Sequence, residues 1–322
     1  MARFRILAIG VLAIVALVAG GVAIALGSGD DSSKPAVAAS PTGLATPTDV
    51  AAGVDAGAGV AVSVGRLDQD GTARSYLVLA PTTVDPATPL LVALHDRAAT
   101  PGDEATRDEL VPFVAAGQAV LVYPVGYDQT WNADDGCCGA AVTEGLDDVA
   151  FVGMVADAVR SRFGLTGPTD LIGYSNGGRL AYAIACRDTS RYTAIVTVSA
   201  APTTPDCAQA EVPVPLFAGV VLDDPELPTP EDPLTAPTAL ADLEQQWTAR
   251  NACVGDADAV TAGTATVRTW TACGEGTIVE TVAWRTGGHS WPDVDTVGSP
   301  DAADLVWSFL SGVHQRAALA AG

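Results

Sequence analysis

The fold is decided by one stretch of sequence, Asp170-Leu171-Ile172-Gly173-Tyr174-Ser175-Asn176-Gly177. It begins with an apolar run typical of a buried strand, and the helical pattern Arg179–Ala185 follows it directly. A Gly-x-Ser-x-Gly between a strand and a helix holds its serine on a tight turn, where larger flanking side chains would collide with both elements. The helix then aims its free N–H groups at negative charge that develops nearby. This placement predicts Ser175 as a nucleophile, and an ordinary glycine-rich turn is the alternative.

A nucleophilic serine needs a base, and the chain has three histidines, His95, His289 and His314. We predict that His289 is the base, because it lies in a glycine-rich loop that can carry an imidazole to the serine. The alternative is a loop histidine bonded only to backbone. His314 falls in a terminal helical pattern and is expected at the surface. His95 ends the apolar run Leu90–Leu94 and is expected to shape a loop near the nucleophile.

The third member of such a site is a carboxylate that orients the histidine. With this motif, the carboxylate falls between the serine and the histidine along the chain. Asp223 and Asp224 follow the apolar run Val214–Val221, so either would emerge beside the nucleophile at the carboxyl edge of a sheet. Spacing alone does not separate the two, and either would also suit a turn.

The rest of the chain predicts a mostly parallel sheet covered by helices, because short apolar runs alternate with longer helical patterns from about Gly59. The expected strands are Val60–Gly65, Ser75–Leu79, Leu90–Leu94, Ala119–Tyr123, Asp170–Gly173, Ala194–Val198 and Val214–Val221. Asp147 and Asp148 precede a run with apolar residues every three to four positions, so we expect both to cap a helix. A last amphipathic helix is expected over Ala302–His314.

Composition narrows the function. The 322 residues include 16 Lys and Arg against 38 Asp and Glu, a formal net charge of −22. This balance excludes a nucleic-acid binder that tracks phosphates. A hydrophobic content of 48% supports a large core and excludes wholesale disorder. No metal, nucleotide or flavin motif occurs, so we expect neither a metal nor another cofactor.

The N-terminus predicts export. Arg3 and Arg5 precede an uncharged run from Ile6 to Leu26, which is long enough to span a bilayer. We favour a retained signal anchor over residues 1–27, which makes the membrane a partner of this segment. A cleaved signal peptide, with an Ala-x-Ala at Ala36–Ala38, is the alternative. Either one places the remaining chain in the cell envelope or the extracellular space.

Two further segments complete the expected organisation. Residues 28–58 are rich in Ala, Pro, Thr, Ser and Gly without an apolar period, so a flexible, disordered linker is expected there. Residues 59–318 are expected to form a single domain.

Six cysteines in an exported chain predict disulfides. Local spacing favours two bridges, Cys253 with Cys273, which flank one short segment, and Cys186 with Cys207, which flank a strand-like run. The remaining pair, Cys137 and Cys138, is adjacent in sequence. It would form either a strained vicinal bridge or two reactive thiols, and no metal-ligand spacing accompanies it.

Seven short motifs together are specific. They are Leu94-His95, Tyr123-Pro124, Thr130-Trp131-Asn132, Cys137-Cys138-Gly139, Asp147-Asp148-Val149-Ala150-Phe151, Gly173-Tyr174-Ser175-Asn176-Gly177-Gly178 and Gly287-Gly288-His289-Ser290-Trp291-Pro292. From roughly Ser75 to Ser311 the chain resembles the secreted polyhydroxybutyrate depolymerase and feruloyl esterase-like branch of the α/β-hydrolases. The resemblance implies the α/β-hydrolase fold. It also implies hydrolysis of polyhydroxyalkanoate-type, feruloyl-type or short-chain acyl esters through an acyl-enzyme.

The resemblance also implies roles for single residues. The family follows its catalytic aspartate with Pro-x-x-Pro, and Asp224-Pro225-Glu226-Leu227-Pro228 fits that frame, which selects Asp224 over Asp223. Asn176, Asp96 and Arg97 are similar in position to the family's oxyanion-hole donors, which act through backbone N–H groups. The four cysteines of the two favoured bridges fall where relatives tend to carry cysteines.

Three aromatic side chains are expected to contact substrate. Trp131 and Trp291 lie in loops near the expected mouth of the site and would stack on or cover an acyl group, with His95 beside them. Loop tryptophans that fill local core are the alternative.

Two departures from the family keep other functions open. Asp96 stands where the family has a glycine. A carboxylate aimed into the hole would repel the oxyanion, and a side chain there could turn an N–H away at roughly 3 kcal/mol per donor, whereas one facing solvent would do neither. Val220-Val221 replaces the family's His-Gly before the acid. The alternatives are a cell-envelope protein of this fold that binds a ligand without turnover, and acyl transfer to an envelope sugar.

Overall fold

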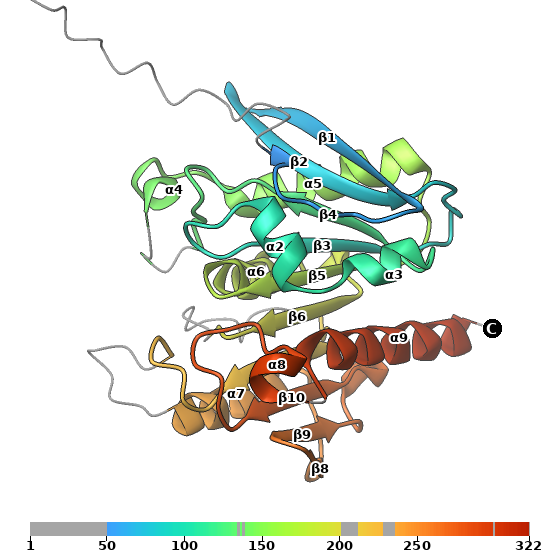
Figure 1. Cartoon of the computed structure of the whole chain (residues 1–322). Coiled ribbons are helices and arrows are strands. Elements are labelled where there is room, and N and C mark those ends of the chain that lie inside the picture. The colour runs from blue at the N-terminus through green and yellow to red at the C-terminus, as the bar shows by residue number, and fades with distance from the viewer. Residues whose placement is uncertain are drawn as a thin grey trace, which may run out of the picture. The chain divides into compact units, whose positions relative to one another are not determined.

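A single sheet organises the chain. The computed structural model describes residues 50–133, 136, 139–200, 212–227, 236–298 and 300–321. Within this part, ten strands pair in the order β1-β2-β4-β3-β5-β6-β7-β10-β9-β8 (Figure 1). They are β1 (Val60–Gln69), β2 (Thr72–Pro81), β3 (Leu90–Leu94), β4 (Val120–Pro124), β5 (Thr169–Tyr174), β6 (Ala194–Val198), β7 (Leu216–Val221), β8 (Asp258–Ala262), β9 (Ala265–Trp270) and β10 (Val279–Trp284).

The middle of the sheet is parallel. Strands β4, β3, β5, β6, β7 and β10 all run in one direction. The antiparallel hairpin β1–β2 adds to one side through β4, and the antiparallel hairpin β8–β9 adds to the other through β10. Every residue of β3, β5 and β6 is buried, as strands covered on both faces must be.

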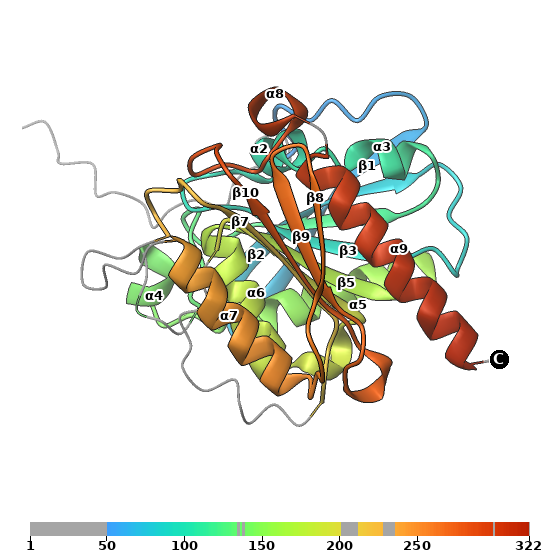
Figure 2. The same ribbon diagram turned by 90° about the horizontal axis from the view of Figure 1, so that it is seen from below.

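Helices cover both faces of the sheet. They are α2 (Pro101–Arg107), α3 (Val111–Ala115), α4 (Ala140–Thr143), α5 (Asp148–Phe163), α6 (Asn176–Arg187), α7 (Ala236–Arg250), α8 (Val294–Val297) and α9 (Ala302–Ala321). Figure 2 shows α5, α6 and α7 on one side of the sheet and α3 and α9 on the other. Because side chains alternate along a strand, Val78 and Val122 enter the first core while Leu79 and Leu121 enter the second. The predicted mostly parallel sheet with helices on both faces is confirmed.

The predicted elements are present with ends that differ by a few residues. All seven predicted strands appear, and the last helix continues past the predicted end at His314 to Ala321. The elements that the sequence does not predict are the strands β8, β9 and β10 and the helices α2, α3, α4, α7 and α8. Most of β8 is exposed at the edge of the sheet, so it shows no apolar run that would mark it as a strand.

The packed part of the chain begins before Gly59. Val50 is 2% exposed and belongs to the core beneath α3 and α9. Ala52 runs so close to α2 that a Cβ on Gly102 would lie 2.1 Å from its carbonyl oxygen. The predicted linker at 28–58 is therefore too long at its C-terminal end, because its last residues carry apolar side chains that reach the core.

The predicted membrane segment at residues 1–27 lies outside the described residues. In the described part of the chain, no helix is long and apolar enough to cross a bilayer.

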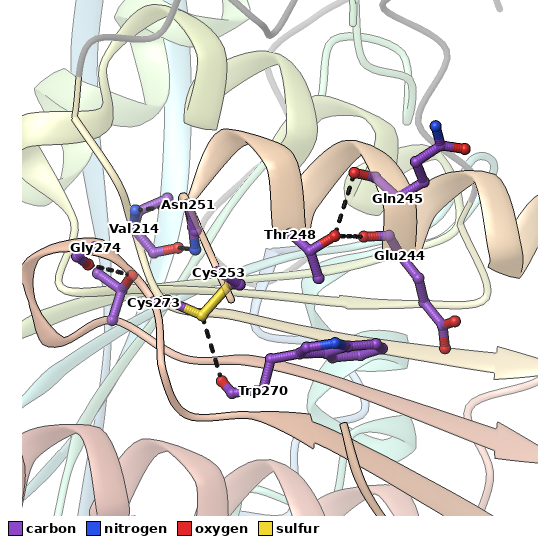
Figure 3. Close-up of a disulfide and its surroundings, with 10 residues drawn as sticks. Val214, Glu244, Gln245, Thr248, Asn251, Cys253, Trp270, Cys273 and Gly274 are labelled. Atoms are coloured by element: carbon purple, nitrogen blue, oxygen red, sulfur yellow. Dashed lines mark hydrogen bonds between the residues drawn. A yellow bond between two sulfur atoms is a disulfide. The ribbon is translucent and has the colours of Figure 1, made fainter. Parts of the chain in front are cut away.

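The predicted bridge between Cys253 and Cys273 is present (Figure 3). It closes the segment that carries the hairpin β8–β9, at the edge of the sheet. Beside it, the Asn251 side chain donates a hydrogen bond to the Val214 carbonyl at 2.7 Å. The bridge and this contact tie the end of α7 to the start of β10 and to the segment before β7.

Of the other four cysteines, only Cys186 lies within the described residues. Cys186 is disulfide-bonded. Its predicted partner Cys207 lies outside the described residues, as do Cys137 and Cys138.

Asp147 and Asp148 have different roles. Asp147 caps α5 as predicted, since its side chain accepts from the Ala150 N–H at 3.1 Å. The prediction that Asp148 is a cap is wrong. Its side chain is fully buried, pairs with Arg74 at 2.7 Å and accepts from the Asn132 N–H at 2.8 Å. A partner 74 residues away in sequence cannot be read from local spacing.

His314 is not the surface residue that its helix position predicts. Its Nε2 lies 2.8 Å from a carboxylate oxygen of Asp170, whose side chain is fully buried in β5. The imidazole therefore holds α9 against the middle of the sheet.

We expect Asp148→Ala to lower the free energy of unfolding by about 3–5 kcal/mol, because it leaves the buried Arg74 guanidinium without its counter-charge. Asp147→Ala is the matched control next to it and should cost about 1 kcal/mol through the lost cap. Urea unfolding of the two variants measures the difference. Equal losses would contradict the assignment of Asp148 as one half of a buried ion pair.

Candidate active site

Ser175 lies on the turn between β5 and α6. Its φ of 51° and ψ of −117° are unusual for a residue with a side chain, and its N–H donates to Val198 O at 3.0 Å. The glycines of the motif let this turn pack closely. A Cβ on Gly173 would lie 2.4 Å from Gly177 O, and a Cβ on Gly177 would lie 2.2 Å from Leu94 O. The turn therefore places the serine at the carboxyl edge of the sheet, beside the end of β3.

The structure brings Ser175, His289 and Asp224 into one chain of hydrogen bonds. Ser175 Oγ lies 2.8 Å from His289 Nε2, and His289 Nδ1 lies 2.8 Å from Asp224 Oδ2. A carboxylate accepts, so Nδ1 carries the proton and Nε2 is left to accept from the serine hydroxyl. The Asp224 side chain is fully buried and the His289 side chain is 15% exposed. This arrangement can draw a proton from Ser175 onto His289.

Asp223 and Asp224 are separated by what they contact. Asp223 Oδ1 accepts from the Gly288 N–H at 2.8 Å, so it holds the backbone of the histidine loop. Asp224 contacts the imidazole itself, and its other oxygen accepts from the Glu226 N–H at 2.8 Å. Val220 and Val221 complete β7 without a turn, so the change from His-Gly leaves Asp224 at the edge of the sheet.

Negative charge surrounds the imidazole of His289. Burial alone would lower its pKa, but the hydrogen bond to Asp224 and the charges of Asp224, Glu226 and Asp96 outweigh burial and raise the pKa above its ordinary value. Glu226 is the exposed member of this set, with one carboxylate oxygen 3.7 Å from His289 Nε2. The protonated imidazole is therefore stabilised, which suits a base that must hold a proton during a reaction.

A small open cavity of about 90 Å³ lies in front of the serine. Its lining includes Asp96, Arg97, Asn176, Ser199, Leu227 and His289. Two of the predicted oxyanion-hole donors, the backbone N–H groups of Arg97 and Asn176, point into this cavity. Both donate to a side-chain oxygen of Asp96. Asp96 Oδ1 accepts from the Arg97 N–H at 2.5 Å and from the Asn176 N–H at 3.4 Å.

The prediction that His95 contacts substrate is wrong, because its side chain is fully buried. Its Nε2 accepts from the Gly126 N–H at 2.9 Å, so its Nδ1 carries a proton and donates to the Asp96 carbonyl at 2.7 Å. Burial lowers the pKa of His95 to about 4, which keeps the ring neutral. His95 thus shapes the loop that carries Asp96 and Arg97, as its position after β3 predicts.

Trp131 and Trp291 also fill local core, the alternative to substrate contact. Trp131 is fully buried, and its indole N–H donates to the His95 carbonyl at 2.7 Å. Its backbone N–H donates to the Asn176 side chain at 2.9 Å, which ties the loop to the start of α6. Trp291 is 2% exposed and packs edge-on against Tyr174.

Residues that the sequence does not single out support the histidine loop. The Tyr174 hydroxyl donates to the His289 carbonyl at 3.2 Å. On the other side, the Arg107 guanidinium lies 4.8 Å from the centre of the Tyr174 ring and pairs with the buried Glu104 at 2.7 Å. Sequence patterns miss both residues, because Tyr174 occupies an x position of the Gly-x-Ser-x-Gly motif and Arg107 belongs to no motif.

The chain is similar in sequence to proteins named as esterases. No family model matches the chain. Over 257 residues it is 26% identical to feruloyl esterase C of Emericella nidulans, which covers 74% of this chain and 83% of that protein. Over 254 residues it is 24% identical to the bifunctional acetylxylan esterase/xylanase XynS20E of Neocallimastix patriciarum, which covers 76% of this chain. The match spans about a third (34%) of that larger protein.

Comparison of structures supports the same fold. The acetyl xylan esterase from Aspergillus awamori matches with a TM-score of 0.56 at 11% identity, over 77% of this chain and 99% of that one. The chain has the α/β-hydrolase fold and is similar in sequence to feruloyl and acetylxylan esterases. Its relatives support the predicted enzyme class, a carboxylic ester hydrolase. Polyhydroxybutyrate is not named among these relatives, so that part of the resemblance stays a prediction.

Removing the charges around His289 should lower its pKa in this hydrolase. We expect a decrease in Glu226→Gln and a larger one in Asp224→Asn, which also loses the charged hydrogen bond. As the pH rises, His289 then loses its proton at a lower pH in each variant than in the wild type. With three histidines in the chain, NMR titration of the ring protons follows each one. An unchanged His289 pKa in Asp224→Asn would contradict the pairing.

Proposed function

We propose that this chain is an exported serine esterase that hydrolyses carboxylic esters through Ser175, His289 and Asp224. The observation that carries the proposal is the pair of 2.8 Å hydrogen bonds joining the three side chains at the mouth of the cavity. Export rests on the predicted N-terminal segment.

In the first half of the reaction, Ser175 Oγ attacks the ester carbonyl carbon and its proton passes to His289 Nε2. The carbonyl π electrons move to the oxygen, which becomes an oxyanion facing the Arg97 and Asn176 N–H groups. When the carbonyl re-forms, the bond to the alcohol oxygen breaks and His289 returns its proton to that oxygen. The alcohol leaves and the acyl group stays on Ser175.

In the second half, water attacks the acyl-enzyme and gives a proton to His289. The bond to Ser175 Oγ then breaks, His289 protonates the serine, and the carboxylic acid leaves. Asp224 keeps the imidazole in the required tautomer and stabilises its charged form throughout. The ligand-binding alternative is not favoured, since the full set of proton-transfer contacts is in place. Transfer to a sugar would share the acyl-enzyme and replace water as acceptor.

The described walls of the cavity favour a short acyl group. The cavity is small, about 90 Å³, and Trp131 and Trp291 are packed into the core instead of offering a face to an aromatic acid. Acetyl and acetylxylan-type esters are therefore proposed ahead of feruloyl and polyhydroxyalkanoate-type esters. The names of the two sequence relatives do not decide this order, since one is an acetylxylan esterase/xylanase and the other a feruloyl esterase.

We expect the protein to hydrolyse p-nitrophenyl acetate faster than p-nitrophenyl butyrate or methyl ferulate. Ser175→Ala should lose at least about 10³-fold in kcat. The assay compares initial rates of the wild type and the variant at equal folded concentration. A folded wild type that is no faster than Ser175→Ala on every ester would refute the esterase proposal, and methyl ferulate as the best substrate would refute the short-acyl preference.

A further inference from the structure

Two backbone N–H groups in front of Ser175 already have an acceptor within the chain. The Asn176 N–H lies at the start of α6 and the Arg97 N–H lies in the loop after β3, so they come from different elements. Both are directed at Asp96 Oδ1, at 3.4 Å and 2.5 Å. The same two groups are the donors that a tetrahedral oxyanion would need next to Ser175.

We infer that Asp96 is a built-in plug of the oxyanion hole, which each substrate must displace before Ser175 can attack. The inference rests on the proposed esterase function. It gives Asp96 a role separate from those of the nucleophile, base and acid: Asp96 limits when a substrate carbonyl can reach the oxyanion hole.

The hydrogen bonds from the Arg97 and Asn176 N–H groups to Asp96 indicate how the plug competes with a substrate. A charged acceptor makes hydrogen bonds roughly twice as strong as a neutral one, so the carbonyl oxygen of an ester competes poorly with a carboxylate for these donors. The contact to Arg97 is short and the contact to Asn176 is long for a hydrogen bond. Asp96 therefore lies closer to the Arg97 N–H than to the Asn176 N–H. Because the acceptor is a side-chain oxygen, rotation of the Asp96 side chain can release both N–H groups without moving α6 or β3.

Hydrogen bonds hold the backbone of the loop beneath the plug, so we assign the movement to the Asp96 side chain. The Asp96 carbonyl accepts from the neutral, fully buried His95 ring at 2.7 Å. The next turn is fixed by a bond from the Ala98 N–H to the Gln129 carbonyl at 2.9 Å. The Asp96 side chain itself is only partly buried at the cavity. Solvent can thus receive the carboxylate when an oxyanion takes its place.

The plug opposes catalysis in two ways. It must be displaced before the carbonyl oxygen reaches its donors, which weakens substrate binding. A carboxylate that remains nearby then repels the negative charge that develops on that oxygen, which slows the chemical step. Removing the carboxylate should therefore raise kcat/KM, the opposite of what removing a supporting residue does.

The test is a series at this position with p-nitrophenyl acetate as substrate. Asp96→Ala frees both N–H groups and should raise kcat/KM at least about tenfold, a fraction of the 10²–10³-fold that one oxyanion donor contributes. Asp96→Asn keeps an acceptor oxygen without the charge and should fall between the wild type and Asp96→Ala. Asp256→Asn, which removes an exposed carboxylate outside the cavity, should stay within about twofold of the wild type.

A second readout does not depend on turnover. An alkylboronic acid forms a tetrahedral adduct with a reactive serine, and its oxygen occupies the oxyanion hole. Its inhibition constant should fall in the order wild type, Asp96→Asn, Asp96→Ala. Because Asp96→Asn keeps the size of the side chain, it tests the plug even where Asp96→Ala disturbs the loop.

The outcomes separate the plug from the esterase proposal. Turnover in Asp96→Ala from a nearly silent wild type supports the plug. An active wild type with both Asp96 variants equal or slower overturns the plug and leaves the esterase intact. If the wild type and both Asp96 variants match Ser175→Ala in turnover and none binds the boronic acid, the esterase proposal fails and the plug fails with it.

Discussion

The site depends on the close contact between the turn after β5 and the end of β3. Gly177 lies so near the Leu94 carbonyl that a Cβ would come within 2.2 Å of it. This contact puts the start of α6 beside the loop of His95, Asp96 and Arg97, at the point where the strand order changes direction between β3 and β5. Without it, the nucleophile would lie apart from the two N–H groups that face it.

Buried polar contacts then fix the surrounding loops in place. Asn176 and His95 both bind the loop of Trp131, and Asp148 binds its next residue while paired with Arg74. These polar groups are buried, and a buried polar atom without a hydrogen-bond partner costs free energy. Each partner therefore holds the other in position. His95 and Trp131, which the sequence predicts to contact substrate, are thus buried residues that hold the loops of the site.

The sequence predicts the parts that local rules determine. The strand-to-helix turn of Ser175 and the glycine-rich loop of His289 have local signatures, and the seven predicted strands have apolar runs. The side chains of Trp131 and His95 point into the core, and this direction depends on long-range partners such as Asn176 and Gly126. Arg107 beneath Tyr174 and His314 on Asp170 join residues far apart in the chain, so no spacing rule finds them.

The central claim is that Ser175 is the nucleophile activated by His289. The most direct test is to react the wild-type protein with a fluorophosphonate probe and locate the adduct by mass spectrometry. We predict one adduct, on Ser175, formed far more slowly in His289→Ala. An unmodified Ser175, or labelling at an equal rate without His289, would contradict the claim.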